Sequence, residues 1–204
     1  MIDGTNGTSP SSSIQVYDTT LNTWQTDSAT DLVSRDGVAS AVDLAGNIYL
    51  IGGFNGSSVL SVVTEFNPAS GTVVALPSML TPRAFAAAAT GSDGKIYVFG
   101  GESSTGVALS SAEVFDPVSH SWTPTASLPQ GVIGASAVAD GTTIYVIGGN
   151  NSLGVPSSAV FAFNTVPIRR FRWLPCRRPS LMRLPALWMA RSWSPAVSEA
   201  AAAT

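Results

Sequence analysis

Charged residues are scarce in this sequence. Asp, Glu, Lys and Arg make up 11% of its 204 residues, against roughly 25% in an average globular domain. Its single cysteine, Cys176, excludes a disulfide framework and a zinc site built from cysteines. No apolar run reaches the ~20 residues of a membrane-spanning helix, and the first residues are neither basic nor apolar, so we expect no membrane span and no signal peptide in this stretch. The 19 glycines and 13 prolines favour short strands joined by turns.

The charge that is present is divided between two parts of the chain. Residues 1–165 contain 12 of the 13 acidic residues and only three basic ones, which gives a net charge of −9. Residues 166–204 contain seven arginines and one acidic residue, Glu199, which gives +6. This abrupt change of composition indicates a boundary near residue 165.

Residues 1–165 contain an internal repeat with a period of 48 to 49 residues. Its clearest element is an apolar-Tyr-apolar-apolar-Gly-Gly segment, which occurs three times: GNIYLIGG (46–53), GKIYVFGG (94–101) and TTIYVIGG (142–149). A second element centres on an aromatic residue at positions 17, 66, 115 and 163, and Trp24 and Trp122 follow the first and third of these. A third element begins with Arg35, Arg83 and Gly131 in successive repeats. Self-similarity at a fixed period indicates a repeat architecture.

The Gly-Gly segment, the turn Phe115-Asp116-Pro117 and the tryptophan that follows it resemble the kelch repeat, in its bacterial type. The resemblance covers about residues 11–165. It implies an all-β fold, namely a partial kelch β-propeller of about three four-stranded blades in an open arc, with an irregular, non-repeat C-terminal tail. The expected boundaries are a half blade at 1–24, repeats at about 34–73, 82–122 and 131–165, and the tail at 166–204. The parent protein is expected to be secreted or exposed on a cell surface, because low charge with abundant Ser, Thr and Ala suits that class.

The composition of each repeated segment predicts its place in a blade. The alanine-rich runs 86–89 and 135–139 suit the innermost strand, where blades converge and space is least. The nearly all-apolar run 96–99 suits a strand covered on both faces by neighbouring blades. The Gly-Gly pairs allow a positive φ or the close approach of another backbone. Tyr and Trp side chains suit contacts between blades, each with one polar partner.

Two interpretations of the basic tail, residues 166–204, are open. Arginines interleaved with aromatic residues are typical of a segment that binds nucleic acid or a membrane. The alternative, which we favour, is that a frame change near codon 165 turned the next repeat into out-of-frame protein. Trp188-Met189-Ala190 forces Asp-Gly in the shifted frame, at twice the repeat distance from Asp93-Gly94. On this hypothesis the tail has no nucleic-acid partner.

The loops that follow the Gly-Gly strands are the best candidates for a binding surface, because loops on a rigid scaffold carry recognition. They differ in sequence while the strands repeat. Their first residues supply six candidate ligand-binding residues: Phe54, Asn55, Glu102, Ser103, Asn150 and Asn151. Arg35 and Arg83 are two further candidates, as a basic rim for an acidic partner. The alternative for both arginines is a buried ion pair or a hydrogen bond between blades.

These features favour a scaffold that binds a protein or glycan over an enzyme. His120, the only histidine, occupies a turn position held by Asn22 and Gly71 in other repeats. No catalytic triad, pair of metal ligands or phosphate-binding loop is recognisable, so we expect no catalytic residue, metal or cofactor. Two alternatives stay open: a piece of a kelch-type enzyme that resembles galactose oxidase or sialic-acid epimerase, and a gene fragment without function. An open arc also predicts self-association through its blade edges.

Overall fold

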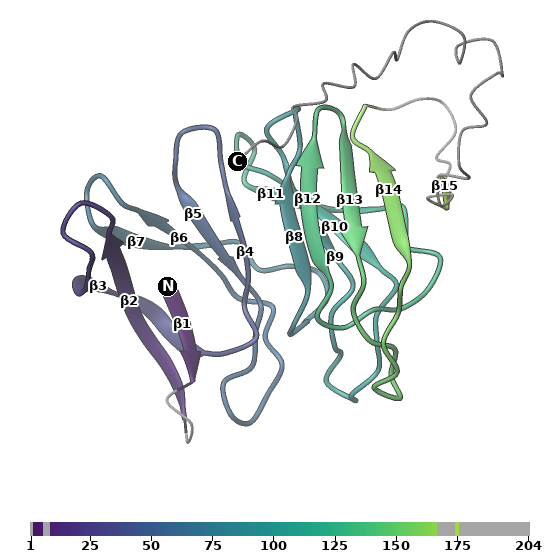
Figure 1. Cartoon of the computed structure of the whole chain (residues 1–204), viewed down its shortest axis with the longest axis horizontal. Coiled ribbons are helices and arrows are strands. Elements are labelled where there is room, and N and C mark those ends of the chain that lie inside the picture. Colours follow the sequence, from purple (N-terminus) through teal and green to yellow (C-terminus); the bar gives the residue numbers. More distant parts are fainter. Residues whose placement is uncertain (1, 6–8, 167–173, 176–204) are drawn as a thin grey trace, which may run out of the picture.

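A computed structural model describes residues 2–5, 9–166 and 174–175 of the chain. These residues form strands and turns without a helix, and therefore include no helix long and apolar enough to cross a membrane. The strands build four antiparallel sheets, which stand side by side along an open arc (Figure 1). The prediction of a partial all-β propeller is thereby confirmed, with one blade for each sheet.

Three of the blades have the same order, in which each strand pairs with the next along the chain. Blade 2 contains β4 (Ala39–Val42), β5 (Ile48–Ile51), β6 (Val63–Asn67) and β7 (Thr72–Leu76). Blade 3 contains β8 (Ala87–Thr90), β9 (Ile96–Phe99), β10 (Ala112–Asp116) and β11 (Ser121–Thr125). Blade 4 contains β12 (Ser136–Asp140), β13 (Thr143–Ile147), β14 (Val160–Asn164) and β15 (Leu174–Pro175). Blade 1 contains three strands, β1 (Ile2–Thr5), β2 (Pro10–Asp18) and β3 (Thr23–Arg35).

The structure differs from the expected boundaries at both ends of the repeat region. β3 continues to Arg35, past the expected end of the half blade at residue 24, and pairs with β2 through two register shifts. At the other end β15 pairs with β14, so that blade 4 extends beyond residue 165. A strand edge offers unpaired N–H and C=O groups to any segment that reaches it, whatever the pattern of that segment. Residues 167–173 and 176–204 lie outside the described residues, and the out-of-frame hypothesis stays a prediction.

The alanine-rich runs are the innermost strands, as their composition predicts. β4 lies beside β8, and β8 lies beside β12, so the first strands of blades 2 to 4 are neighbours. The side chains at this convergence include the buried Ala41, Ala87 and Ala89. The next strand outward is enclosed on both faces, since all four residues of β9 are buried.

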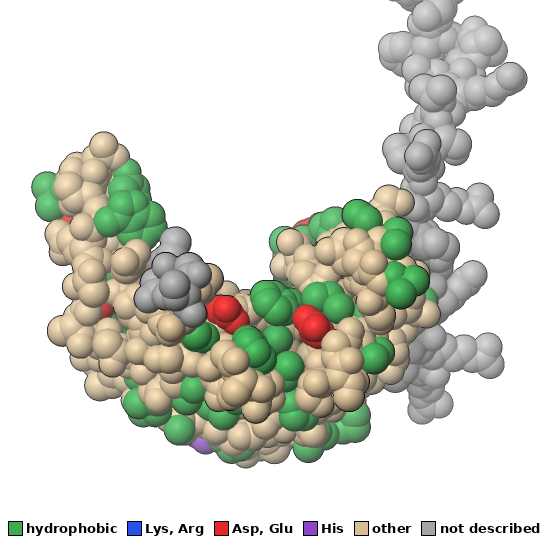
Figure 2. Space-filling view, turned by 90° about the horizontal axis from the view of Figure 1, so that it is seen from below, with side chains coloured by type: hydrophobic (Ala, Val, Ile, Leu, Met, Phe, Trp, Pro, Cys, Tyr) green, Lys and Arg blue, Asp and Glu red, His purple; other side chains and the backbone are tan. Residues whose placement is uncertain are grey.

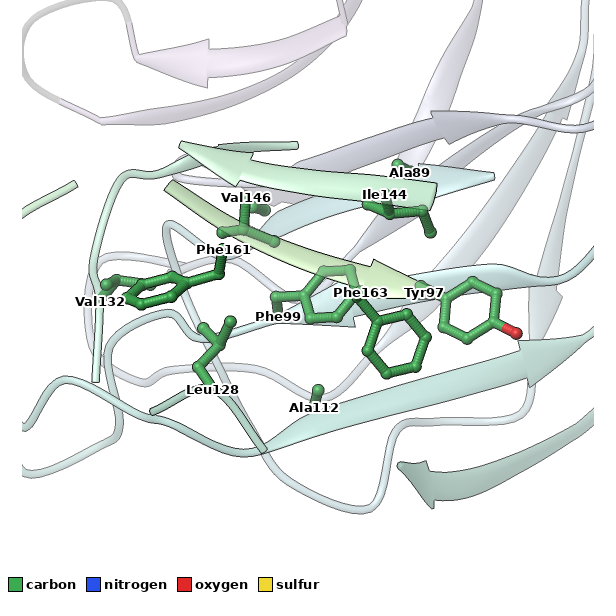
Figure 3. Packing of buried hydrophobic residues seen from close by; sticks show 11 residues of the cluster. Ala89, Tyr97, Phe99, Ala112, Leu128, Val132, Ile144, Val146, Phe161 and Phe163 are labelled. Atoms are coloured by element: carbon green, nitrogen blue, oxygen red, sulfur yellow. The ribbon is translucent and has the colours of Figure 1, made fainter. Parts of the chain in front are cut away.

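Aromatic rings join neighbouring blades. Between blades 3 and 4, Phe163 of β14 lies against Tyr97 and Phe99 of β9, with ring centroids 5.2 and 5.4 Å apart (Figure 3). Between blades 2 and 3, the indole N–H of Trp122 donates to the carbonyl oxygen of Pro77 at 2.8 Å. Burial of one such side chain stabilises a fold by about 1.5–3 kcal/mol. The apolar core therefore lies mainly between the blades.

The turn before β5 is stabilised by the carboxylate of Asp43. This carboxylate accepts hydrogen bonds from the backbone N–H groups of Ala45 and Asn47, at 2.8 and 2.9 Å, and from the Asn47 side chain at 2.9 Å. Burial alone would raise the pKa of Asp43, but the hydrogen bonds from Asn47, Ala45 and Tyr49 outweigh it and lower the pKa.

Acid is expected to weaken this turn, because a carboxylate whose pKa is lowered by folding stabilises the native state above its unfolded pKa. That contribution disappears as the pH falls below about 4. Asp43→Asn should lower the free energy of unfolding by about 1 kcal/mol at pH 7 and should lose less further stability than the parent between pH 5 and pH 3. Urea midpoints measured at these three pH values check both statements, and parallel acid profiles would contradict the second.

Candidate functional site

The three loops after the Gly-Gly strands, one from each of blades 2 to 4, occupy equivalent places in their blades. They are residues 54–60, 102–110 and 150–157, here called the loop surface. The backbone N–H of Ala108 donates to the Ser152 hydroxyl at 2.8 Å, which ties the second loop to the third. Figure 2 shows the arc from below the view of Figure 1. The concave side carries acidic and hydrophobic side chains, and no Lys or Arg of the described residues is visible there.

The first residues of these loops, Phe54, Glu102 and Asn150, occupy one equivalent position. Each forms two isolated β-bridges, one to the segment before the innermost strand and one across its own loop. Glu102, for example, pairs through its backbone with Ala84 and with Ala108. The backbone of this position is thus fixed, while the side chain is partly exposed in Phe54 and Glu102 and exposed in Asn150. One position of the fold therefore carries an aromatic, an acidic and an amide side chain in successive blades.

The second residues of the loops have a structural role that the sequence interpretation did not assign to them. The side-chain oxygen of Asn55 accepts from the N–H of Ser58 at 2.8 Å, and that of Asn151 accepts from the N–H of Val155 at 3.0 Å. The hydroxyl of Ser103 accepts from the N–H of Val107 at 3.1 Å. Each of these three side chains closes its own loop. They therefore shape the loop surface from within.

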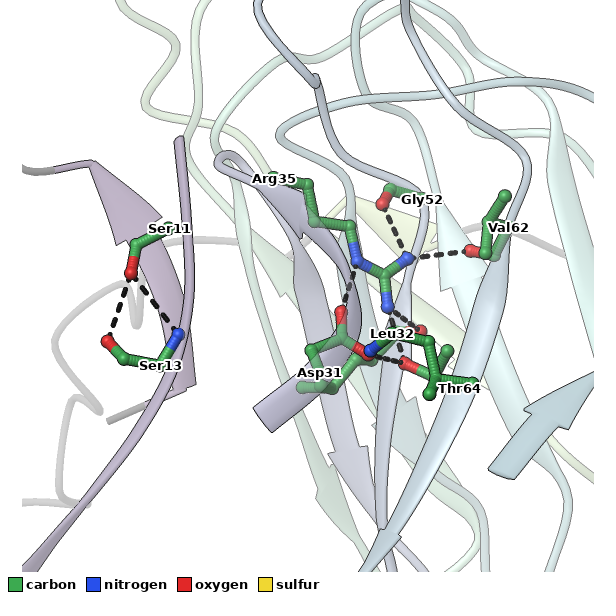
Figure 4. A network of polar contacts seen from close by, with 9 residues as sticks. Ser11, Ser13, Asp31, Leu32, Arg35, Gly52, Val62 and Thr64 are labelled. Carbon is green, nitrogen blue, oxygen red and sulfur yellow. Dashed lines mark hydrogen bonds and ion pairs between the residues drawn. The ribbon is translucent and has the colours of Figure 1, made fainter. Parts of the chain in front are cut away.

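Arg35 does not form the basic rim that its spacing suggested, because its side chain is fully buried. Its guanidinium donates to Asp31 at 2.9 Å and to the carbonyl oxygens of Gly52 and Val62, both at 3.0 Å (Figure 4). Thr64 bridges the guanidinium and Asp31, which completes the network. The arginine lies at the end of blade 1, and the two carbonyl groups belong to blade 2. Its hydrogen bonds therefore join the two blades.

Arg83 repeats this arrangement one blade later, and it too is fully buried. It donates to the carbonyl oxygens of Gly100 and Ser111 at 2.8 and 3.0 Å, and it forms an ion pair with Glu113 at 2.7 Å. Burial lowers the pKa of Arg83, and the charge of Glu113 opposes that shift. The alternative of a buried ion pair describes both arginines, and neither is accessible to a ligand.

The last repeat replaces both members of this ion pair together. The 48-residue spacing pointed to Gly131, but Val132 stands where Arg83 would be, because its carbonyl oxygen accepts from the N–H of Gly101 as that of Arg83 accepts from the N–H of Gly53. Phe161 of β14 stands where Glu113 would be. Phe161 is buried and packs in the apolar cluster that includes Leu128 and Val132 (Figure 3). A glutamate without its arginine would leave a buried, unpaired charge at a cost of several kcal/mol. The joint replacement avoids that cost.

Two residues beside the loop surface were not found from the sequence. Phe85 has a positive φ of 52°, at the position held by Gly37 and Gly134 in the other repeats, and its side chain is exposed. Its backbone N–H donates to Gly37 at 2.7 Å, and its carbonyl accepts from Gly134 at 2.8 Å. Asp36 immediately precedes Gly37 and pairs with Phe54. The signal was Phe at an aligned glycine position, because a bulky residue with positive φ is uncommon.

Comparison with known proteins identifies the repeat. The family model of the KLHDC2/KLHL20/DRC7 Kelch-repeats domain matches residues 2–180. The chain belongs to the kelch-repeat family. A solved kelch-like neighbour, described as "Structure of YjhT", has a TM-score of 0.69 at 18% identity, over 88% of this chain. The kelch arc spans 65% of the YjhT chain, and the likeness shows the fold alone. No curated protein matches the chain.

The chemistry of this kelch surface is acidic and aromatic. Glu102 and Asp36 supply carboxylates, and Phe54 and Phe85 supply rings, from blades 2 and 3 and the segments leading into them. Among residues 2–5, 9–166 and 174–175, no group of three or more His, Cys, Asp or Glu side chains is arranged to hold a metal ion. His120 lies away from these residues in the β10–β11 turn. Its φ of 49° is close to the 53° of Asn22 and the 67° of Gly71, the equivalent turn residues.

Proposed function

We propose that this kelch arc is a binding scaffold, and not an enzyme, which recognises a protein or glycan through the loop surface. The observation that carries the proposal is the shared position of Phe54, Glu102 and Asn150. Its backbone is held by two bridges in each of blades 2 to 4, whereas its side chain changes from aromatic to acidic to amide. Invariant backbone with variable side chains is the arrangement expected of a recognition surface on a rigid support.

The side chains beside this position indicate what the ligand presents. The exposed ring of Phe85 offers an apolar face that packs on a sugar ring or an aliphatic side chain. Glu102 accepts hydrogen bonds, so it suits ligand hydroxyl or ammonium groups. A net charge of −9 over residues 1–165 disfavours acidic ligands. Self-association through the open ends of the arc is part of the same proposal.

Binding is expected to fail when the variable position is changed. The full chain would be screened on an array of neutral and amino-bearing glycans and against a displayed library of random peptides. Phe54→Ala combined with Glu102→Gln and Asn150→Ala should lower the affinity for any selected ligand at least tenfold, as measured by biolayer interferometry. The matched control replaces three exposed residues of turns that lie outside the loop surface, Leu44→Ala, Ser70→Ala and Val118→Ala, and should leave affinity unchanged. Equal binding by the two triple variants, or no ligand above background, would refute the proposal.

A further inference from the structure

One aromatic contact occurs both between blades 2 and 3 and between blades 3 and 4. Tyr49, on the second strand of blade 2, lies 5.9 Å from Phe115 on the third strand of blade 3. Tyr97, on the second strand of blade 3, lies 5.2 Å from Phe163 on the third strand of blade 4. Each contact therefore needs a tyrosine from one blade and an aromatic ring from the blade that follows.

The first blade carries the ring half of this contact on an open face. Tyr17 of β2 is equivalent to Phe115, yet it is 42% exposed where Phe115 is 1% exposed. Trp24 of β3 is likewise equivalent to Trp122, and the two are 59% and 8% exposed. The open pair already has the geometry of the buried one, since Tyr17 and Trp24 are 5.1 Å apart and Phe115 and Trp122 are 5.0 Å apart. The face is preformed for a preceding blade.

The last blade carries the tyrosine half on the opposite open face. Tyr145 of β13 is equivalent to Tyr49 and Tyr97, and it meets no aromatic ring among the described residues. Two residues further, Ile147 is 43% exposed, whereas its equivalent Phe99 is 0% exposed. Burial alternates along β13, while every residue of β9 is buried. One face of β13 is thus only partly covered, and it is the face on which a following blade would pack.

We infer that these two faces bind each other, so that the last blade of one copy packs against the first blade of a second copy. Tyr145 of one copy then meets Tyr17 of the other, as Tyr97 meets Phe163 within the chain. The partner is a second copy because the chain itself supplies both halves of a contact that it already makes twice. This pairing rests on the self-association proposed above, and it names the surfaces that carry it.

The pairing is head to tail, and its geometry limits the products. Two copies bring together eight sheets, since each copy has four, and propellers close with four to eight blades. If both ends meet, the two arcs form a closed dimer with two identical contacts. If the ends do not meet, the same contact adds copies in a line. Either product uses the same two faces.

Two single variants, each with one damaged face, test the pairing. Trp24→Asp places a charge on the first blade, and Ile147→Asp places one on the last blade, both at exposed positions that leave each blade its own core. Sedimentation velocity of the full chain from 1 to 100 µM should show association for the parent and for Val118→Asp, a control on an exposed outer turn. Each face variant alone should be monomeric, with apparent affinity at least tenfold weaker. Circular dichroism spectra that match the parent show that the variants are folded.

Mixing the two face variants gives the decisive result. Each retains the face that the other has lost, so an equimolar mixture should form a one-to-one dimer that grows no further. Association of either variant alone would show contacts between like faces and would overturn the head-to-tail pairing. A monomeric parent at 100 µM would overturn both the pairing and self-association. Ligand binding measured on the same samples bears only on the loop surface, so failure of the scaffold function is told apart from failure of the pairing.

Discussion

Replacing Arg83 with methionine is expected to lower the free energy of unfolding by about 3–5 kcal/mol, the cost of removing one partner from a buried ion pair. The guanidinium is fully buried, and the carboxylate of Glu113 lies with it, 2.7 Å away. Methionine retains much of the apolar volume but leaves that carboxylate without its counter-charge. It also removes the donor to the carbonyl oxygens of Gly100 and Ser111. Urea denaturation followed by tryptophan fluorescence measures the loss.

A second variant separates the unpaired charge from the lost packing. Arg83→Met combined with Glu113→Leu should regain a large part of the stability, because the last repeat already has two apolar residues, Val132 and Phe161, at these positions. Recovery should be incomplete, since Glu113 also accepts from the N–H groups of Leu80 and Thr81 at 2.8 and 3.0 Å. A double variant no more stable than Arg83→Met alone would show that the carboxylate is not the source of the loss.

Lys95→Met is the matched control for the same change of side chain. Lys95 pairs with Asp116 at 3.0 Å, but both side chains are partly exposed to water. Exposed ion pairs contribute about 0–1 kcal/mol, because water and salt screen them. The control should therefore cost less than about 1 kcal/mol. Equal losses of unfolding free energy for Arg83→Met and Lys95→Met would contradict the stabilising role assigned to the buried Arg83 ion pair.

The blade architecture could be predicted from the sequence because a repeat shows as a fixed spacing of similar segments along the chain. The spacing of the three Gly-Gly segments correctly predicted the blades, and the alanine-rich runs correctly predicted the innermost strands. The direction of a side chain is not visible in this way. Two arginines at the repeat distance are compatible with a buried contact between blades and equally with an exposed basic rim. Only the burial of Arg35 and Arg83 distinguishes these two arrangements. The last repeat lacks both the arginine and its acidic partner, since Val132 and Phe161 stand at their positions. This joint loss was a signal that the pattern contained.

The sequence predicted which loops follow the Gly-Gly strands, and their use as a binding surface stays a prediction. The loops were correctly placed after the Gly-Gly strands, but the sequence could not separate Asn150, whose side chain is presented outward, from Asn151, whose side chain closes the loop. Both are asparagines in one exposed segment, and the difference depends on hydrogen-bond geometry. Phe85 was missed for a related reason. Phe85 has the positive φ of the glycines at the equivalent positions in the other repeats. It stands in an apolar stretch of sequence, which does not indicate that its ring is exposed.

Replacing Gly52 with alanine is expected to lower the free energy of unfolding by about 2–5 kcal/mol, through two additive causes. Its φ of +67° is unfavourable for any residue with a Cβ atom, at about 1–2 kcal/mol. The added Cβ would also lie 2.2 Å from the carbonyl oxygen of Arg83, which must then move. Overpacking of this kind costs a further 1–3 kcal/mol or so. The same carbonyl accepts from the N–H of Gly53 at 2.9 Å, so the displacement disturbs the contact between blades 2 and 3.

Gly71→Ala isolates the second cause, because the two glycines share one backbone conformation. Gly71 also has a φ of +67°, but an added Cβ there would meet no atom within 4 Å. It should cost only the conformational term of about 1–2 kcal/mol. The difference between the two variants, measured by urea denaturation under identical conditions, is the free energy of the close approach between the Gly-Gly pair and the next blade. If the two losses are equal, the Gly-Gly pair is required for its positive φ alone, and the blades have room to separate where the structure places them in contact.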